Sequence, residues 1–284
     1  MRAALRLLVV PFFPVFSILP ALANAELRDL LDARRIALQA RGTGVHGGEA
    51  VRVELRNTTS ARVAGRIPAG WVFTSVDEQV QDLLVVRDEP FDLAPGALRT
   101  ITCRAFCAQG ALRGPSEGER YRPGALGAPA LVALAQAVAA APYDDDLVQA
   151  AVWAVSNGYS IAGMGALDST SADTLRLVVA RLSGQPPPRY GMRFQYAAGS
   201  VCTGRPDVVE QPFRITVGVP TTLNAVVLDR NGRIVHILED HTMIEPGRYA
   251  WRLQVPVADL PPGRYAIHVW TTAHPGVHRL PFTL

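Results

Sequence analysis

The sequence contains no lysine: all 28 of its basic residues are arginines, against 25 acidic residues. Without a lysine ε-amine, an internal Lys–Asn isopeptide bond is excluded. The chain also has little excess of either charge. Its formal net charge of +3 falls to +1 if Arg2 and Arg6 leave with a signal peptide. Because so small a charge gives no electrostatic footprint for a nucleic acid or an anionic membrane, neither is expected as a partner.

Long apolar runs are scarce. The longest, Leu7–Leu19, follows two arginines, and Ala23 and Ala25 then give the small-x-small pattern that signal peptidase reads. We therefore expect residues 1–25 to be a cleaved signal peptide. No later run approaches the roughly 20 apolar residues that a spanning helix needs, so no integral membrane segment is expected after processing. The mature protein is expected to be secreted, periplasmic or on the cell surface.

Cysteine is also sparse, at three residues, and the number is odd. In an oxidising compartment at least one thiol must stay unpaired within the monomer. Cys103 and Cys107 lie in one predicted strand about 13 Å apart, whereas a disulfide needs Cα atoms within about 7 Å, so these two are not expected to pair. A disulfide from Cys202 to either of them is possible, and the Cys103–Cys202 bond would leave Cys107 free.

The first half of the mature chain predicts a sheet followed by helices. Apolar and polar residues alternate in the runs that indicate strands, at 36–40, 51–55, 61–67, 71–74, 82–86 and 97–106. From residue 127 the apolar period becomes helical, and helices are expected at 129–142, 144–157 and 171–182. We interpret residues 26–185 as one domain, a β-sandwich or barrel with an appended helical subdomain.

The second half is again β-patterned. Residues 186–208 begin with three prolines and are interpreted as a linker. Beyond them, alternating strands and a hairpin turn at Asp229–Gly232 predict an all-β sandwich of the immunoglobulin-like type over residues 209–284. The fold class expected for the whole chain is therefore α+β.

Three short segments of this C-terminal part carry a family resemblance: Val227–Val235, Pro246–Tyr249 and Leu260–Tyr265. They resemble the immunoglobulin-like modules of flagellar hook-capping proteins and of type IX sorting domains. The resemblance implies an accessory module that carries no activity of its own.

Motifs of common enzymes fail in their structural context. The glycines of Gly42–Gly47 have dinucleotide-binding spacing, but a strand follows where that motif requires a helix. Gly158–Ala162 approaches a nucleophile elbow, yet it follows a helix instead of a strand. The six histidines lack the spacing of zinc ligands. We therefore expect no enzyme, no catalytic residue, no metal site and no cofactor; a hydrolase with Ser160 or Cys107 as nucleophile is the weakest alternative.

One pair of segments points to a different chemistry. Phe106-Cys107-Ala108-Gln109 ends the predicted sheet, and Val148–Trp153 lies in the second predicted helix. Together they resemble the thioester domains of bacterial surface adhesins, in which an aromatic-Cys motif and an apolar-Gln motif form an internal thioester. The resemblance implies that Cys107 supplies the sulfur and Gln149 the acyl carbon, with Phe106 and Trp153 flanking and shielding the bond.

Elementary chemistry sets the requirements for such a bond. A thiol and a carboxamide are unreactive when free, so they must be held in contact and oriented. Water must also be excluded, and the i, i+4 spacing of Gln149 and Trp153 puts an indole ring beside the carboxamide on one helical face. Both requirements are met if the strand end at Cys107 faces this helix.

Two functions follow as hypotheses. The first is a secreted or cell-surface binding and adhesion protein that attaches covalently, through Cys107 and Gln149, to an amine or thiol on a surface protein or a glycan-associated group. The alternative is a non-covalent extracytoplasmic binding or envelope-structural protein in which Cys107 is inert or disulfide-bonded.

Overall fold

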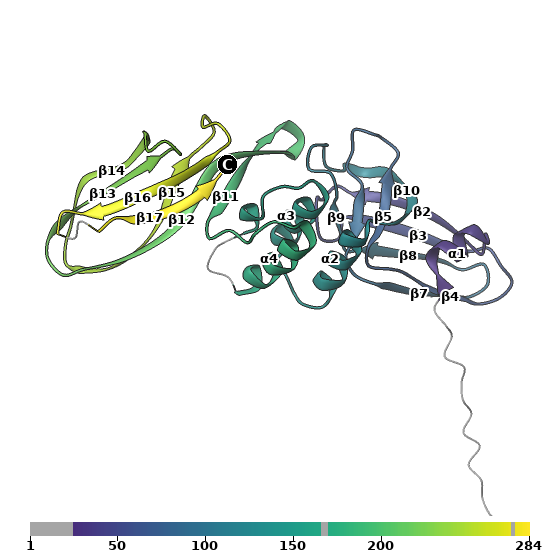
Figure 1. The fold of residues 1–284 in the computed structure, drawn as a ribbon. Coiled ribbons are helices and arrows are strands. Elements are labelled where there is room, and N and C mark those ends of the chain that lie inside the picture. Colours follow the sequence, from purple (N-terminus) through teal and green to yellow (C-terminus); the bar gives the residue numbers. More distant parts are fainter. Residues whose placement is uncertain (1–24, 166–169, 274–275) are drawn as a thin grey trace, which may run out of the picture.

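The computed structural model describes residues 25–165, 170–273 and 276–284. The signal peptide predicted over residues 1–25 lies outside these ranges except for Ala25. The fold is α+β and dominated by β-sandwich, which confirms the predicted fold class. Figure 1 shows the N-terminal strands, a group of helices and the C-terminal strands following one another along the molecule.

The N-terminal part begins with β1 (Ala25–Glu26) and the short helix α1 (Leu27–Asp32). Its other strands are β2 (Ile36–Thr43), β3 (Val51–Asn57), β4 (Val63–Ile67), β5 (Trp71–Ser75), β6 (Leu83–Val85), β7 (Glu89–Leu93), β8 (Leu98–Cys103), β9 (Ala105–Cys107) and β10 (Glu117–Leu126). One sheet has the order β8-β3-β2-β10-β5-β6-β9 and a smaller one the order β1-β4-β7. Because only Arg104 separates β8 from β9, the two ends of the larger sheet meet and the sheet curls back on itself.

Three differences from the sequence prediction concern these strands. The run predicted at 97–106 divides at Arg104 into β8 and β9, which pair with different neighbours. β7 was not predicted because Pro90 interrupts it, and as the edge of the smaller sheet it tolerates a proline. β10 was not predicted because its residues show little alternation of buried and exposed positions.

The three predicted helices are confirmed as α2 (Pro129–Ala139), α3 (Asp145–Ser156) and α4 (Thr170–Ser183). α3 begins as its acidic run indicated: the Asp144 carboxylate caps the helix by accepting a hydrogen bond from the Asp146 N–H. A short 3₁₀ turn, η1 (Ile161–Gly163), lies between α3 and α4.

The strands β6 and β9 lie between two apolar cores. Successive side chains of β9 point into different cores: Ala105 and Cys107 belong to the core enclosed by the sheets, and Phe106 belongs to the core beneath the helices. Leu83 and Leu84 of β6 divide in the same way. The helices therefore cover the outer face of this end of the sheet (Figure 1), and β9 is buried on both faces.

The C-terminal part is a sandwich of two antiparallel sheets. Its elements are β11 (Gly191–Ala197), η2 (Ala198–Ser200), β12 (Val201–Val217), β13 (Thr221–Leu228), β14 (Ile234–Ile244), β15 (Gly247–Pro256), β16 (Arg264–Thr271) and β17 (His278–Thr283). The sheets have the orders β11-β12-β15 and β14-β13-β16-β17 and share one buried core. The predicted turn at Asp229–Gly232 is present, and the Asp229 carboxylate accepts hydrogen bonds from the Asn231 and Arg233 N–H groups.

The segment interpreted as a linker, 186–208, is irregular only at its beginning. β11 starts at Gly191, and β12 runs without interruption from Val201 through residue 209, where the second domain was expected to start. The two strands form a hairpin. Sequence patterning missed it because prolines and glycines within 201–212 obscure the alternation that is clear only from Phe213 onward.

Candidate functional site

The structure brings Cys107 and Gln149 together from positions 42 residues apart. Cys107 is the last residue of β9, and α3 packs directly across that strand. Gln149 lies in the second turn of α3, one turn after the cap at Asp144. The strand end and helix face that the motifs required to meet are thus in contact.

Gln149 hydrogen-bonds to both backbone groups of Cys107. The Cys107 N–H donates to Gln149 Oε1 at 3.0 Å, and Gln149 Nε2 donates to the Cys107 carbonyl at 2.7 Å. These backbone groups point away from β6. The residues that flank β6 bond to the neighbours of the β9 strand instead, because the Val86 N–H donates to the Arg104 carbonyl and the Asp82 carbonyl accepts from the Ala108 N–H. The carboxamide shares this edge of β9 with the loop before β3: the Cys107 N–H also donates to the His46 carbonyl at 3.2 Å, and the Ala105 N–H donates to the Gly48 carbonyl at 2.7 Å. The two hydrogen bonds to Cys107 fix the orientation of the carboxamide.

Both groups are shielded from solvent. Cys107 is 0% exposed and Gln149 is 8% exposed. Burial raises the pKa of the Cys107 thiol from 9.0 to about 12, so the thiol is protonated at neutral pH. The pair is a neutral thiol and a neutral carboxamide, with no water layer between Gln149 and the Cys107 backbone.

The two predicted flanking residues, Phe106 and Trp153, lie in different cores. Trp153 follows Gln149 by one helical turn and belongs to the same core cluster as Cys107. The Phe106 ring lies on the other face of β9 and presses against Gly47, where a Cβ atom would come within 2.7 Å of the ring. Trp153 thus belongs to the core that also contains Cys107, and Phe106 belongs to the core beneath the helices.

Sequence reasoning missed Gln81, which organises the loop after Cys107. It is 0% exposed, and its Oε1 accepts hydrogen bonds from Trp153 Nε1 at 3.2 Å and from the Gln109 N–H at 3.1 Å. Its Nε2 donates to the Leu112 carbonyl, and its own carbonyl accepts from the Tyr121 hydroxyl. A single buried glutamine has no sequence signature, because only the fold shows what surrounds it.

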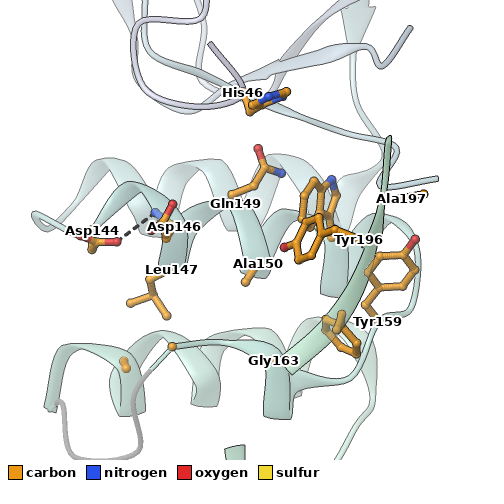
Figure 2. Close-up of a pocket in the computed structure, with 14 residues that line it drawn as sticks. His46, Asp144, Asp146, Leu147, Gln149, Ala150, Tyr159, Gly163, Tyr196 and Ala197 are labelled. Atoms are coloured by element: carbon orange, nitrogen blue, oxygen red, sulfur yellow. Dashed lines mark hydrogen bonds between the residues drawn. The ribbon is translucent and has the colours of Figure 1, made fainter. Parts of the chain in front are cut away.

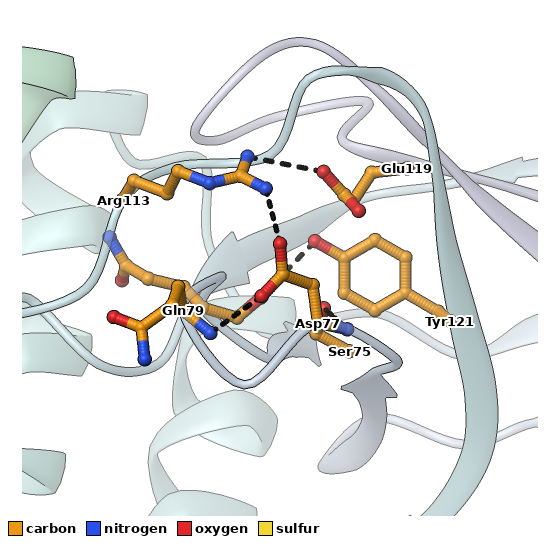
Figure 3. Close-up of polar contacts among 7 residues, drawn as sticks. Ser75, Asp77, Gln79, Arg113, Glu119 and Tyr121 are labelled. Atoms are coloured by element: carbon orange, nitrogen blue, oxygen red, sulfur yellow. Dashed lines mark hydrogen bonds and ion pairs between the residues drawn. The ribbon is translucent and has the colours of Figure 1, made fainter.

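An ion-pair cluster holds the same loop from outside (Figure 3). Arg113 lies 2.7 Å from a carboxylate oxygen of Asp77 and 3.1 Å from one of Glu119. The Gln79 N–H donates to the Asp77 carboxylate, and together with Arg113 it lowers the pKa of Asp77. The loop that leaves Cys107 is therefore tied to two neighbouring segments of the sheet.

A pocket of about 900 Å³ opens beside Gln149. Its wall includes residues of the helices and the β2–β3 loop, among them His46, Asp144, Asp146 and Trp153, and residues of the C-terminal hairpin, among them Phe194 and Tyr196. Figure 2 shows the Gln149 carboxamide pointing from α3 towards His46, with Tyr196 and Tyr159 to one side. Cys107 is not among the lining residues, so the pocket reaches the Gln149 carboxamide, whereas Cys107 belongs to the core enclosed by the sheets.

All three cysteines are buried and free in the structure. The possible disulfide between Cys103 and Cys202 is not formed in it and stays a prediction. Cys103 is the last residue of β8, and Cys202 lies in the hairpin strand β12. The Cys202 carbonyl accepts a hydrogen bond from the Tyr159 hydroxyl.

The discarded motifs lie in ordinary structural positions. Gly42 lies near the end of β2, and the glycines that follow it lie in the loop before β3, so no helix follows this motif. Ser160 caps η1, its hydroxyl accepting from the Ala162 N–H at 3.3 Å. Over the described ranges, no three His, Cys, Asp or Glu side chains are grouped so as to hold a metal ion.

Comparisons of the chain with protein-family models, with curated proteins and with solved structures find no match. Within the part of the chain that the structure describes, no helix has the length and apolar character needed to cross a membrane.

Proposed function

We propose that the protein is a secreted or cell-surface binding protein that forms an internal Cys107–Gln149 thioester and uses it to attach covalently to a partner. The pair of hydrogen bonds between the Gln149 carboxamide and the Cys107 backbone carries the proposal. The resemblance of both motifs to surface thioester domains supports it, and so does the expected signal peptide.

Thioester formation is a substitution at the carboxamide. Cys107 Sγ bonds to Gln149 Cδ, the Cδ–Nε2 bond breaks, the thiol proton passes to the departing nitrogen, and ammonia leaves. The raised pKa of Cys107 keeps that proton on the sulfur until it is transferred. Since a buried neutral thiol is a weak nucleophile, fixed orientation must supply most of the rate, as it does in intramolecular reactions.

The two hydrogen bonds also suit the chemistry. In the tetrahedral intermediate, negative charge develops on Gln149 Oε1, and the Cys107 N–H already donates to that atom. The bond from Nε2 to the Cys107 carbonyl holds the leaving nitrogen in place until it departs. One residue thereby provides the nucleophile and the donor that stabilises the oxyanion.

In the capture of a partner, Cys107 Sγ is the leaving group and no longer the nucleophile. A primary amine that enters the pocket attacks the Gln149 acyl carbon, an amide forms, and the Cys107 thiol is released with the proton lost by the amine. A partner thiol would exchange in the same way to give a new thioester. The Asp144 and Asp146 carboxylates at the pocket favour a cationic alkylamine over an anionic thiolate.

The intact mass of the purified mature protein tests the proposal. We expect a deficit of one ammonia relative to the sequence, and methylamine should abolish it by adding at Gln149. Cys107→Ala should show no deficit, whereas Cys103→Ala, which removes an equally buried thiol from the same core, should keep it. A full mass in the untreated protein would reject the thioester and leave the non-covalent binding protein with an inert Cys107.

A further inference from the structure

The β11–β12 hairpin belongs to the C-terminal sheets but packs on the N-terminal part. β12 pairs with β15 of the sandwich over residues 208–217. Before that point, β11 and the first half of β12 extend towards α3 and β9 (Figure 1), and Gly199 at the tip lies 3.7 Å, measured from an ideal Cβ position, from the Cβ of Arg113. The hairpin therefore reaches the loop that follows Cys107.

Glycines on both parts let aromatic rings interlock at this contact. The Tyr159 ring lies between Gly110 and Gly204, and a Cβ atom at either glycine would come within 2.7 Å of it. The ring of Phe194 lies against Gly163, where a Cβ atom would approach to 2.3 Å. These contacts are too close for any side chain, so the two surfaces are fitted to each other.

The contact continues to the reactive pair through a chain of aromatic rings. Ring centroids are 5.7 Å apart for Phe194 and Tyr159, and 6.4 Å apart for Tyr159 and Trp153. The Tyr159 hydroxyl donates to the Cys202 carbonyl of β12 at 2.8 Å. Phe194 packs against the N-terminal sheet core and the C-terminal core alike. Trp153, on the Gln149 face of α3, is thus supported from the C-terminal part.

The hairpin also completes the pocket beside Gln149. Phe194, Tyr196 and Ala197 line it together with His46 and residues of the first turns of α3. Without them that side of the carboxamide would face bulk water. Tyr196 is 61% exposed, so its ring forms the outer part of the pocket wall.

We infer that the β11–β12 hairpin is part of the reactive site and sets the lifetime of the thioester by excluding water from the Gln149 acyl group. This inference rests on the proposed thioester. It assigns the C-terminal part a role in the chemistry, beyond that of an accessory module, through Phe194 and Tyr196 and their neighbour Tyr159 of the N-terminal part.

Matched tyrosine variants test the inference. Tyr159→Phe removes only the hydroxyl that bonds to the Cys202 carbonyl; Tyr249→Phe removes a comparable bond, 2.7 Å to the Glu245 carbonyl, inside the C-terminal part. Because a net hydrogen bond corresponds to about a fivefold change in an equilibrium, Tyr159→Phe should shorten the half-life of the ammonia deficit in buffer about fivefold, with Tyr249→Phe unchanged. Phe194→Ala, which removes the interlocking ring, should shorten it further.

The measurement is the rate at which intact mass gains one water, followed with the rate of methylamine addition. Hydrogen exchange of residues 107–113 and 149–153 supplies a second readout, and protection there should fall in Phe194→Ala but not in Tyr249→Phe. An ammonia deficit whose lifetime is the same in wild type, Tyr159→Phe and Phe194→Ala would overturn the role of the hairpin alone. A wild-type protein of full mass would overturn the thioester and this inference together.

Discussion

Cys103 and Cys107 are alike in burial and different in their partners. Each ends a strand of the same sheet, each is 0% exposed, and burial raises the pKa of each thiol to about 12. Cys103 pairs with Val51 of β3 and Cys107 with Leu83 of β6, but the backbone groups of Cys107 also hydrogen-bond to the Gln149 carboxamide. Since burial affects both thiols alike, the feature that separates the two sites is the carboxamide fixed beside Cys107, on which the proposed thioester depends.

The largest difference between the two cysteines should appear when the protein is alkylated under brief denaturation at neutral pH. Cys103 and Cys202 should be modified fully, and Cys107 only after methylamine treatment, because its sulfur is held in the thioester. In Gln149→Glu, which has no ammonia to release, all three should be modified. Peptide mapping measures the modification at each site. Equal modification of Cys103 and Cys107 in untreated wild type would remove the distinction.

Once the thioester is prevented, the two cysteines should contribute equally to the decline of the free energy of unfolding at alkaline pH. A thiol pKa raised on folding contributes stability that is complete below pH 9 and is lost as the pH rises towards 12. In a Gln149→Met background, which prevents the thioester without placing a charge beside Cys107, each thiol should therefore add a decline of about 1.4 kcal/mol per pH unit in the free energy of unfolding above pH 9. Cys103→Ala and Cys107→Ala should each flatten the decline by the same amount, as measured by denaturant unfolding between pH 7 and pH 11. Unequal flattening would show that the two sites differ in burial as well.

A smaller effect is expected from the shield beside Cys107. Trp153→Phe keeps an aromatic ring but loses the hydrogen bond to Gln81 Oε1, so water should reach the thioester more often. We expect hydrolysis to accelerate about fivefold, in line with the loss of one net hydrogen bond. Trp251→Phe, in the C-terminal aromatic stack, is the matched control and should not change the rate. The shield assignment fails if both variants hydrolyse at the wild-type rate.

The sequence was informative where local chemistry decides the structure. The acidic run at Asp144 predicted the start of α3, and the i, i+4 spacing of Gln149 and Trp153 predicted a shared helical face. Both are local properties of a helix, whose period fixes them whatever the rest of the chain does. The apolar run at 97–106 predicted strand structure up to the residue before Cys107, but it did not predict the break at Arg104 that places Cys103 and Cys107 in different strands.

Other features depend on distant parts of the chain. Gln149 reaches β9 at the edge opposite β6, and no pattern around Cys107 contains that information. Gln81 became important only through the fold that brings Trp153 and Gln109 to it. The packing of the hairpin comes from the contact of Phe194 with Tyr159, which lies on a different part of the chain, so the local pattern over residues 186–208 predicts only a linker.

The most direct test of the central claim is tandem mass spectrometry of a digest prepared at mildly acidic pH, where thioesters persist. The account predicts one cross-linked species that joins the Cys107 peptide to the Gln149 peptide and lacks one ammonia, and its loss after methylamine treatment. Recovery of both peptides separately, with a free Cys107 thiol and an intact Gln149 carboxamide, would contradict the account.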